Sequence, residues 1–357
     1  MKYNVALMPS GHRFICEDTQ NILAAGLEAG FMLPYNCRSG FCRTCKSKIV
    51  TGTISYADRP MTHYLPAADH AKGFALLCQA NPRSDLIIET DEIVGAENLR
   101  PRQTPSRIVA LERITPDVMI VKLRLPLNEN VRYFPGQHLA FILGAGVTRE
   151  YSIANMCRPE GMTELELHVR HTPGGYFTDK LFGEMSVKAL MRLELPLGTF
   201  FLRSDSDAPV ALLATGTGFA PIKAMVEHAI ATGELERRRF ILYWGARQES
   251  DLYMADVARR WAAEHHGFSF VPVLSQPPST GAWSGRTGYV QDCLIDDQPD
   301  LSAFDVYACG SPAMIEHSAR RFSEMKDRGP ARYYADEFLT AADRATRNMD
   351  ILVEEGS

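Results

Sequence analysis

The chain has 357 residues, a formal net charge of −5 and a pI of about 6.1, with 45% apolar and 23% charged residues. This length accommodates two or three domains with separate cores, and the composition is typical of a soluble globular protein. Because the charge is mildly acidic and no apolar run approaches the roughly 18 residues of a membrane span, we expect neither a nucleic-acid nor a membrane partner.

The first segment, residues 1–94, combines short strands with one helix. We expect strands near 3–8, 12–16, 46–50 and 85–89 and a helix near 19–29. Its first residues, "MKYNVALMPSGHRF", alternate like a strand and lack the apolar core of a signal peptide, so we expect a cytoplasmic protein. These elements suit a small β-grasp domain.

Four cysteines of this segment have an informative spacing. Cys37, Cys42 and Cys45 form a C-x4-C-x2-C pattern, and Cys78 is the next cysteine along the chain. In a reducing compartment, clustered cysteines bind metals or perform redox chemistry more often than they form disulfides. The spacing is that of plant-type 2Fe-2S proteins, whereas structural zinc usually takes two short cysteine pairs. We therefore predict a 2Fe-2S ferredoxin domain, with zinc and unrelated thiols as the alternatives.

The residues around these cysteines favour an anion. Gly40 and the small Ser39 and Thr44 allow the backbone to curl and aim amide N-H groups at sulfur. Basic side chains flank the same loop: Arg38, Arg43, Lys46 and Lys48. They predict a reduction potential above the roughly −400 mV of plant-type ferredoxins; a solvated face or a docking surface for acidic partners is the alternative. Three other cysteines are expected to be small buried side chains: Cys16, Cys157 and Cys293.

The second segment is predicted to bind a flavin. A polar stretch at 95–105 predicts a linker, and short alternating apolar runs over 106–204 predict an antiparallel β-barrel. In "TREYSIAN", Arg149 and Tyr151 fall on one face of a strand and Ser152 follows. A cation beside an aromatic ring and a hydroxyl suits a phosphate-bearing ring cofactor, although Tyr151 could equally be a core residue.

A glycine turn further along this segment supports the same prediction. In "HVRHTPGGYFTDKL", Gly174, Gly175 and Thr178 stand ahead of a predicted helix. Free N-H groups and the helix dipole favour a pyrophosphate at such a position. The alternative is an ordinary glycine turn capped by Thr178.

The third segment, residues 205–339, alternates apolar strands with helical patterns, which predicts a parallel sheet with helices on both faces. A strand-to-helix turn that suits a dinucleotide phosphate is formed by Thr215, Gly216, Thr217 and Gly218. Such sheets bind ligands at the carboxyl ends of their strands, where "CGSP" also falls. Cys309 is predicted to lie against a nicotinamide because Gly310 permits close approach, with simple packing as the alternative.

These motifs together resemble one family. From the cysteine loop through "REYS", "PGGYFT", "LPLGTF", "ATGTGFAPI", "YWGAR", "WSGRTGYV" and "YACGSP" to "YYADEF", the chain resembles the NADH-dependent iron-sulfur flavoprotein reductases of multicomponent oxygenases. It is similar too to the reductase of 3,6-dideoxyhexose biosynthesis. The resemblance implies ferredoxin, flavin and nucleotide domains in that order, with a 2Fe-2S cluster, FAD and NADH as cofactors.

The resemblance also implies roles for individual residues. Arg149 and Tyr151 would hold the flavin phosphate and ring, and Ser152 would lie near flavin N5. The FAD pyrophosphate would be bound by Gly174, Gly175 and Thr178. The NAD pyrophosphate would lie in the turn formed by Thr215, Gly216, Thr217 and Gly218, with Cys309 and Gly310 near the nicotinamide. Ser152 and Cys309 are therefore the candidate catalytic residues.

Two features depart from the family pattern. The long spacing from Cys45 to Cys78 places an insertion near "ADRPMTHYLPAAD". A polar tail over 340–357 follows Phe338, the aromatic residue that would cover the flavin.

The predicted function is electron transfer from NADH to FAD and then, one electron at a time, through the cluster to a protein acceptor. After "YWGA", the carboxylates of Glu249 and Asp251 oppose a 2'-phosphate that Arg247 alone could pair, which favours NADH. We expect the acceptor to be a Rieske non-haem iron or di-iron oxygenase. The alternatives are a partner enzyme in deoxysugar reduction and a ferredoxin-like binding module without chemistry.

Overall fold

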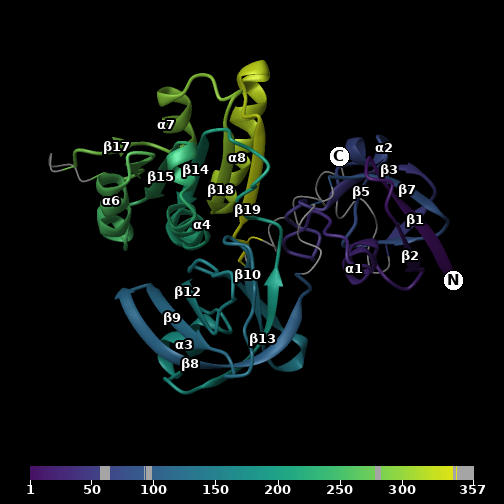
Figure 1. Cartoon of the computed structure of the whole chain (residues 1–357), viewed down its shortest axis with the longest axis horizontal. Coiled ribbons are helices and arrows are strands. Elements are labelled where there is room, and N and C mark those ends of the chain that lie inside the picture. The colour runs from purple at the N-terminus through teal and green to yellow at the C-terminus, as the bar shows by residue number, and fades with distance from the viewer. Residues whose placement is uncertain (57–64, 92, 94–98, 278–282, 341–342, 344–357) are drawn as a thin grey trace. The chain divides into compact units, whose positions relative to one another are not determined.

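The computed structural model describes residues 1–56, 65–91, 93, 99–277, 283–340 and 343. The chain forms two compact units, built mainly from Met1–Pro101 and from Arg102–Phe338 (Figure 1). The predicted insertion near 57–69 and the polar tail over 340–357 lie largely outside the described residues. No helix in the described ranges is long and apolar enough to cross a membrane.

The first unit contains a mixed five-stranded sheet in the order β2-β1-β7-β3-β5 and a separate β4-β6 pair. Its strands are β1 (Lys2–Met8), β2 (Arg13–Glu17), β3 (Lys46–Thr51), β4 (Ile54–Tyr56), β5 (Phe74–Leu76), β6 (Ala80–Pro82) and β7 (Leu86–Glu89). Strand β1 pairs antiparallel with β2 and parallel with β7. The predicted strands are confirmed to within a residue or two, and the mixed sheet confirms the β-grasp domain.

Helices α1 (Ile22–Glu28) and α2 (Ala67–Ala71) complete the first unit as far as the described residues show it. Helix α1 begins after Asn21, whose side-chain oxygen accepts a hydrogen bond from Ala24 N at 2.8 Å. A helix start near residue 19 was therefore predicted too early, because the capping asparagine has extended backbone and fixes the first turn after itself.

The second unit begins with a six-stranded antiparallel sheet in the order β11-β10-β13-β8-β9-β12. Its elements are β8 (Arg102–Thr115), β9 (Val118–Arg124), β10 (His138–Ile142), η2 (Gly144–Gly146), β11 (Thr148–Ser152), β12 (Glu164–Arg170), α3 (Thr178–Gly183) and β13 (Leu190–Leu197). A bridge between Ile153, just after β11, and Leu167 of β12 joins the two edge strands. The sheet therefore closes into the predicted barrel.

The linker predicted over 95–105 is too long at its end, because residues 102–105 form part of a strand. They belong to β8 and pair with β13, Arg102 opposite Leu195 and Pro105 opposite Arg192, and Thr104 is 1% exposed. Polar residues and prolines suggested a loop here. Backbone pairing with a neighbouring strand outweighs that local tendency, since strand formation depends strongly on context.

The second half of this unit is a six-stranded parallel sheet in the order β17-β16-β15-β14-β18-β19, as predicted. Its strands are β14 (Val210–Thr215), β15 (Phe240–Ala246), β16 (Phe268–Leu274), β17 (Arg286–Thr287), β18 (Asp305–Gly310) and β19 (Arg332–Glu337). The helices are η3 (Gly216–Gly218), α4 (Phe219–Ala231), α5 (Glu234–Arg237), η4 (Glu249–Asp251), α6 (Ala255–Glu264), α7 (Val290–Asp297), α8 (Pro312–Glu324) and η5 (Lys326–Arg328).

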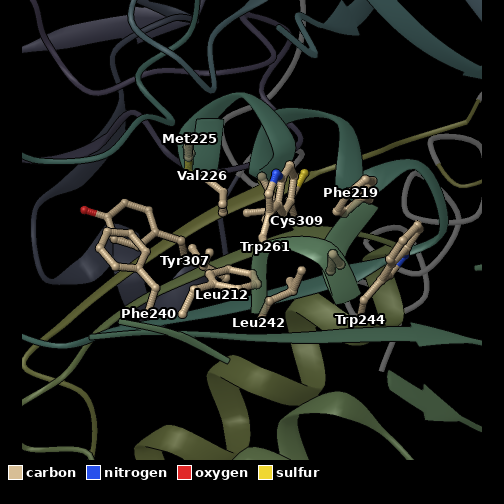
Figure 2. Packing of buried hydrophobic residues seen from close by; sticks show 14 of the residues in the cluster. Leu212, Phe219, Met225, Val226, Phe240, Leu242, Trp244, Trp261, Tyr307 and Cys309 are labelled. Carbon is tan, nitrogen blue, oxygen red and sulfur yellow. The ribbon is translucent and has the colours of Figure 1, made fainter. Parts of the chain in front are cut away.

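Two apolar clusters cover opposite faces of the parallel sheet. Leu212 and Trp244 belong to the cluster with residues of α4 and α6 (Figure 2), whereas Leu213 and Tyr243 belong to that with α7 and α8. This alternation is expected of parallel strands buried on both faces. Strand β14 lies between β15 and β18, so the strand order reverses beside its carboxyl end, where ligands bind in such sheets.

Candidate functional site

The cysteine loop over residues 37–45, ahead of β3, turns through three residues with left-handed backbone. These are Arg38 (φ 51°), Gly40 (φ 84°) and Arg43 (φ 58°). The sequence pointed only to Gly40, because side chains such as arginine rarely adopt positive φ. Alternation of left-handed and ordinary residues turns successive N-H groups inward, which creates a nest for an anion.

The four cysteine side chains lie in two pairs within this nest. Ser39 N and Cys42 N each donate to Cys37 Sγ at 3.4 Å. A hydrogen bond from the Cys42 side chain is the main cause that lowers the pKa of Cys37 to about 4. A hydrogen bond from Cys45 likewise lowers the pKa of Cys78. The sulfurs of Cys37 and Cys78 are therefore favoured as thiolates, the form that binds metal. Hydrogen bonding to these two sulfurs, followed by burial, raises the pKa of Cys42 and of Cys45.

This arrangement fits a binuclear cluster. A 2Fe-2S centre takes four thiolates shared between two irons, which two cysteine pairs can supply. The donor set therefore fits the 2Fe-2S cluster predicted from the spacing.

The basic side chains near the loop differ in how much of their positive charge is available to the cysteine thiols. Lys46 Nζ lies 3.2 Å from Asp69 Oδ2, so part of its charge is offset. Arg43 is exposed, although its backbone belongs to the nest. Its charge is therefore carried on the loop that holds the thiols but is screened by solvent.

We expect Arg43→Glu to lower the reduction potential of the cluster. Exposed charge interactions contribute roughly 0.2–1 kcal/mol, which corresponds to a shift on the order of 10–40 mV for one electron. Redox titration followed by EPR measures the shift, and Arg43→Gln should give about half of it. A potential that is equal in all three proteins would contradict the electrostatic role.

The flavin candidates of β11 lie as the sequence predicted along the strand. Arg149 is opposite Phe141 and Tyr151 is opposite Leu139, so both side chains share one face. The Tyr151 ring lies 5.8 Å from Phe141 and 5.4 Å from Phe177, measured between centroids, and packs partly against the barrel core. The half-buried Tyr151 ring therefore fits both interpretations, a core residue and a side chain on the face where the flavin is predicted.

Ser152 is the last residue of β11 and is 6% exposed, opposite His138 of β10. A buried hydroxyl at the end of a barrel strand can donate to or accept from a ring held there. Its role beside flavin N5 stays a prediction.

The glycine turn before α3 is built around Thr178. Thr178 Oγ1 donates to Thr172 O at 2.9 Å and accepts from Thr172 N at 3.2 Å. A Cβ at Gly175 would lie 2.4 Å from that oxygen, whereas one at Gly174, with φ of 77°, would meet nothing within 4 Å. The Thr178 hydroxyl thus orders the turn itself, and Gly174 provides its open surface.

The nucleotide turn packs tightly against the end of β18. A Cβ at Gly218 would lie 2.1 Å from Cys309 O, and one at Gly310, where φ is 138°, would lie 2.2 Å from Thr215 Oγ1. Thr215 Oγ1 also accepts from Ser311 N at 2.9 Å. Thr215 therefore approaches Gly310 closely, and the approach of a nicotinamide to this position stays a prediction.

The structure adds Arg170 to this turn, a residue that the sequence analysis did not select. A Cβ at Gly216 would lie 3.4 Å from its Cζ and Nη1 atoms. Arg170 Nη2 is buried and has no hydrogen-bond partner among the described residues, while Nε lies 3.3 Å from Asp117 Oδ2. A cation from the barrel thus reaches the turn where a phosphate is expected. The alternation in "ELELHVR" was the pattern that could have revealed it.

Cys309 is fully buried within the apolar cluster of α4 and α6 (Figure 2). Burial, followed by the nearby Asp336 carboxylate, raises its pKa well above the ordinary value. Phe338 packs against the same cluster, and its N-H donates to Gly310 O at 2.8 Å. The structure thus brings Phe338, Cys309 and Gly310 together, and their contacts to cofactors stay predictions.

Two titratable residues of β12 should make this unit sensitive to acid. Burial raises the pKa of Glu166, but hydrogen bonding from His168 and the charge of Lys223 lower it further, from 4.5 to about 2. A group whose pKa is lower in the folded state contributes stability at pH values above its unfolded-state pKa. It loses that contribution as the pH falls toward its folded-state pKa. Burial lowers the pKa of His168, so its protonation acts in the same direction.

We therefore expect the unfolding free energy to fall by about 3 kcal/mol through Glu166 as pH decreases from 4.5 to about 2. Urea titrations at several pH values measure this, followed by tryptophan fluorescence because Trp244, Trp261 and Trp283 all lie in the second unit. Glu166→Gln should flatten the dependence. An equal slope in the variant would show that Glu166 is not the titrating group.

Family models match all three segments of the chain. Residues 5–83 match the 2Fe-2S iron-sulfur cluster binding domain, residues 105–202 the oxidoreductase FAD-binding domain and residues 212–320 the oxidoreductase NAD-binding domain. The CDP-6-deoxy-L-threo-D-glycero-4-hexulose-3-dehydrase reductase of Yersinia pestis is 38% identical over 90% of this chain and 94% of its own length. The chain belongs to the iron-sulfur flavoprotein reductases. The reductase is thus an oxidoreductase with 2Fe-2S, FAD and NAD-binding domains, and the zinc and binding-module alternatives are set aside.

Oxygenase components are also similar to this reductase. The terephthalate 1,2-dioxygenase reductase component 1 of Comamonas is 30% identical, covering 96% of this chain and 98% of that protein. A solved cytochrome P450 reductase of Amycolatopsis has a TM-score of 0.77 and 32% identity, covering 95% of this chain and 99% of its own. The predicted family, fold class and cofactors are confirmed.

Proposed function

We propose that the reductase oxidises NADH, takes the hydride on FAD and passes single electrons through its 2Fe-2S cluster to a protein acceptor. A nicotinamide gives two electrons together, a cluster takes one at a time, and a flavin does both. The observation that carries the proposal is that one chain joins a four-thiol nest, a flavin barrel and a nucleotide turn.

We assign the residues accordingly. The cluster ligands are Cys37, Cys42, Cys45 and Cys78. The flavin is held by Arg149, Tyr151, Ser152 and the turn of Gly174, Gly175 and Thr178. Arg170 supplies positive charge at the nucleotide turn, where its guanidinium adjoins Gly216. The proposed domains are 1–94, 106–204 and 205–339, with β8 entering the flavin domain from Arg102.

We propose NADH rather than NADPH because of η4, the turn after β15. Asp251 Oδ2 accepts from Gln248 N at 3.2 Å, which fixes this carboxylate in the turn. Glu249 Oε1 lies 3.7 Å from Arg259, so it remains only loosely paired. Two carboxylates held there disfavour a 2'-phosphate by like-charge repulsion. Steady-state kinetics with both nucleotides would test this, and a higher kcat/KM for NADPH would reject it.

Two acceptors are supported by different relatives. The reductases of terephthalate dioxygenase and of cytochrome P450 support an oxygenase partner. The higher identity to the Yersinia reductase supports a partner that deoxygenates a nucleotide-linked hexulose, and we favour it on that ground. None of the eight cysteines, all within the described ranges, forms a disulfide, which is compatible with the reducing cytoplasm where we place the protein.

Electron delivery to each acceptor tests the proposal. NADH, the reductase and either a CDP-hexulose dehydrase or a terephthalate dioxygenase terminal component would be mixed without oxygen, and acceptor reduction followed by stopped-flow absorbance or EPR. We expect faster delivery to the dehydrase. Faster delivery to the dioxygenase would reverse the choice of partner, and no reduction of the flavin by NADH would reject the function.

A further inference from the structure

Strand β12 carries a polar face that the flavin and nucleotide sites do not account for. Leu165, Leu167 and Val169 point into the barrel core, each at most 1% exposed. The alternate residues Glu166 and His168 point the other way, toward the nucleotide-binding half. An acidic group and a fully covered histidine side chain therefore lie where the two halves of the second unit meet.

Lys223 of α4 is the centre of the contacts at this junction. Its ammonium, on a side chain only 9% exposed, lies 3.1 Å from Glu166 Oε1 and 2.8 Å from Glu227 Oε1. It also donates to Ala154 O at 3.2 Å. One buried cation thus joins its own helix to the barrel at both β12 and the segment that follows β11.

The places that Lys223 connects are both next to candidate cofactor residues. Ala154 follows Ser152, the buried hydroxyl of the flavin strand, by two positions. Helix α4 begins directly after the nucleotide turn, one turn before Lys223. The lysine is therefore a short, rigid connection between the flavin strand and the nucleotide turn.

A second chain of contacts runs from the same strand to the nucleotide turn. His168 Nδ1 lies 2.8 Å from Tyr253 Oη, and His168 Nε2 lies 3.1 Å from Glu166. Because a carboxylate only accepts, Nε2 donates to it and Nδ1 accepts from the tyrosine. The Tyr253 ring packs edge-on against Trp244 at 5.2 Å, and Trp244 Nε1 donates to Gly216 O at 3.1 Å.

Such a network is costly to bury, which indicates a specific purpose. An apolar side chain at position 223 would avoid the desolvation of an ammonium and would often be at least as stabilising. Buried charges are instead useful for fixing one geometry among several that apolar packing would tolerate. A hydride donor and acceptor need such a fixed geometry, because a misplacement of about 1 Å can slow a reaction about 100-fold.

We propose that Lys223, acting through Glu166 and the carbonyl of Ala154, is a positioning residue that sets the register of the nucleotide-binding half on the flavin barrel. This inference rests on the proposed function, because it concerns the step in which NADH reduces the flavin. The nucleotide turn itself lies wholly within the nucleotide-binding half, so binding of the nucleotide phosphates depends on the lysine only through Arg170, the residue that the barrel contributes there.

The test compares FAD-loaded wild type with Lys223→Met, which keeps the length of the side chain and removes its charge. We expect the limiting rate of flavin reduction in anaerobic stopped-flow experiments to fall about 100-fold. The long-wavelength charge-transfer absorbance of NAD⁺ with the reduced flavin should weaken, which requires no turnover. Affinity for ADP-ribose, measured by calorimetry, should fall far less than the rate, and Lys223→Arg should regain part of the rate.

Lys122→Met is the matched control. Lys122 pairs with Glu112 at 3.3 Å on the barrel, where both side chains are 40% or more exposed, and its loss should leave all three measurements unchanged. If Lys223→Met does not fold, the double variant Lys223→Met/Glu166→Gln removes the charges of Lys223 and Glu166 together and leaves only the more exposed Glu227 carboxylate without the lysine. It should bind FAD and still be reduced slowly.

Either variant overturns the inference if it is reduced as fast as wild type and keeps the charge-transfer absorbance. An equal loss of ADP-ribose affinity would also overturn it, because the lysine would then support the nucleotide turn itself. If wild type is not reduced by NADH at all, the proposed function fails instead.

Discussion

Cys42→Ser is expected to abolish electron delivery to a protein acceptor and to leave NADH oxidation at the flavin intact. The Cys42 side chain pairs with Cys37, and its own N-H donates to Cys37 Sγ, so the substitution removes a ligand from the nest. Loss of the partners of metal ligands alone costs roughly 10–100-fold, so loss of a ligand should reduce delivery at least about 100-fold. The flavin lies in a different unit and should still bleach.

Anaerobic NADH titration with visible absorbance and low-temperature EPR checks this result. The EPR signal of a reduced 2Fe-2S centre should appear in wild type and be missing in Cys42→Ser. Cys157→Ser is the control, because Cys157 is a half-buried cysteine in the barrel unit. A cluster signal of wild-type intensity in Cys42→Ser would exclude Cys42 as a ligand.

Gly310→Ala is expected to impair the nucleotide site selectively. At φ of 138°, a Cβ would lie 2.2 Å from Thr215 Oγ1 and 2.7 Å from Thr215 O, so β18 or the nucleotide turn must shift. Backbone strain costs about 1–3 kcal/mol and overpacking typically costs a similar amount. We expect at least about a tenfold rise in KM for NADH, since each 1.4 kcal/mol corresponds to tenfold in binding.

Gly288→Ala is the control that separates the effect of backbone strain from that of steric overlap at the added Cβ. Gly288 also has positive φ, 112°, in the same half of the unit, but its Cβ would meet nothing within 4 Å. It should lower stability, measured by urea unfolding, and leave KM for NADH near the wild-type value. Chemical reduction of the flavin by dithionite should be normal in both variants. Equal KM values in both glycine variants would refute the role of the close contact at Thr215.

The sequence contained most of the local chemistry. The spacing of Cys37, Cys42 and Cys45 lies within one loop, and the glycines Gly216 and Gly218 lie within one turn. Such motifs are short, because the ligand contacts consecutive backbone groups, and a local pattern therefore records them. The parallel sheet was equally visible, since strands buried on both faces are continuous apolar runs.

Local composition was misleading where long-range pairing decided the structure. Residues 102–105 looked like linker and are strand, because β13 supplies their backbone partners. Arg38 and Arg43 adopt left-handed backbone that few arginines adopt, and the curled cysteine loop holds them there.

The sequence by itself determined the order of the three segments, three of the four cluster ligands proposed here and the nucleotide turn, because each depends on residues that are neighbours in the chain. Only the tertiary structure decided that Glu166 and His168 of β12 meet Lys223 and Tyr253, and that Arg170 reaches Gly216. Those contacts join residues about 50 to 90 positions apart, and their strength comes from burial, which exists only once the barrel and the parallel sheet have packed together.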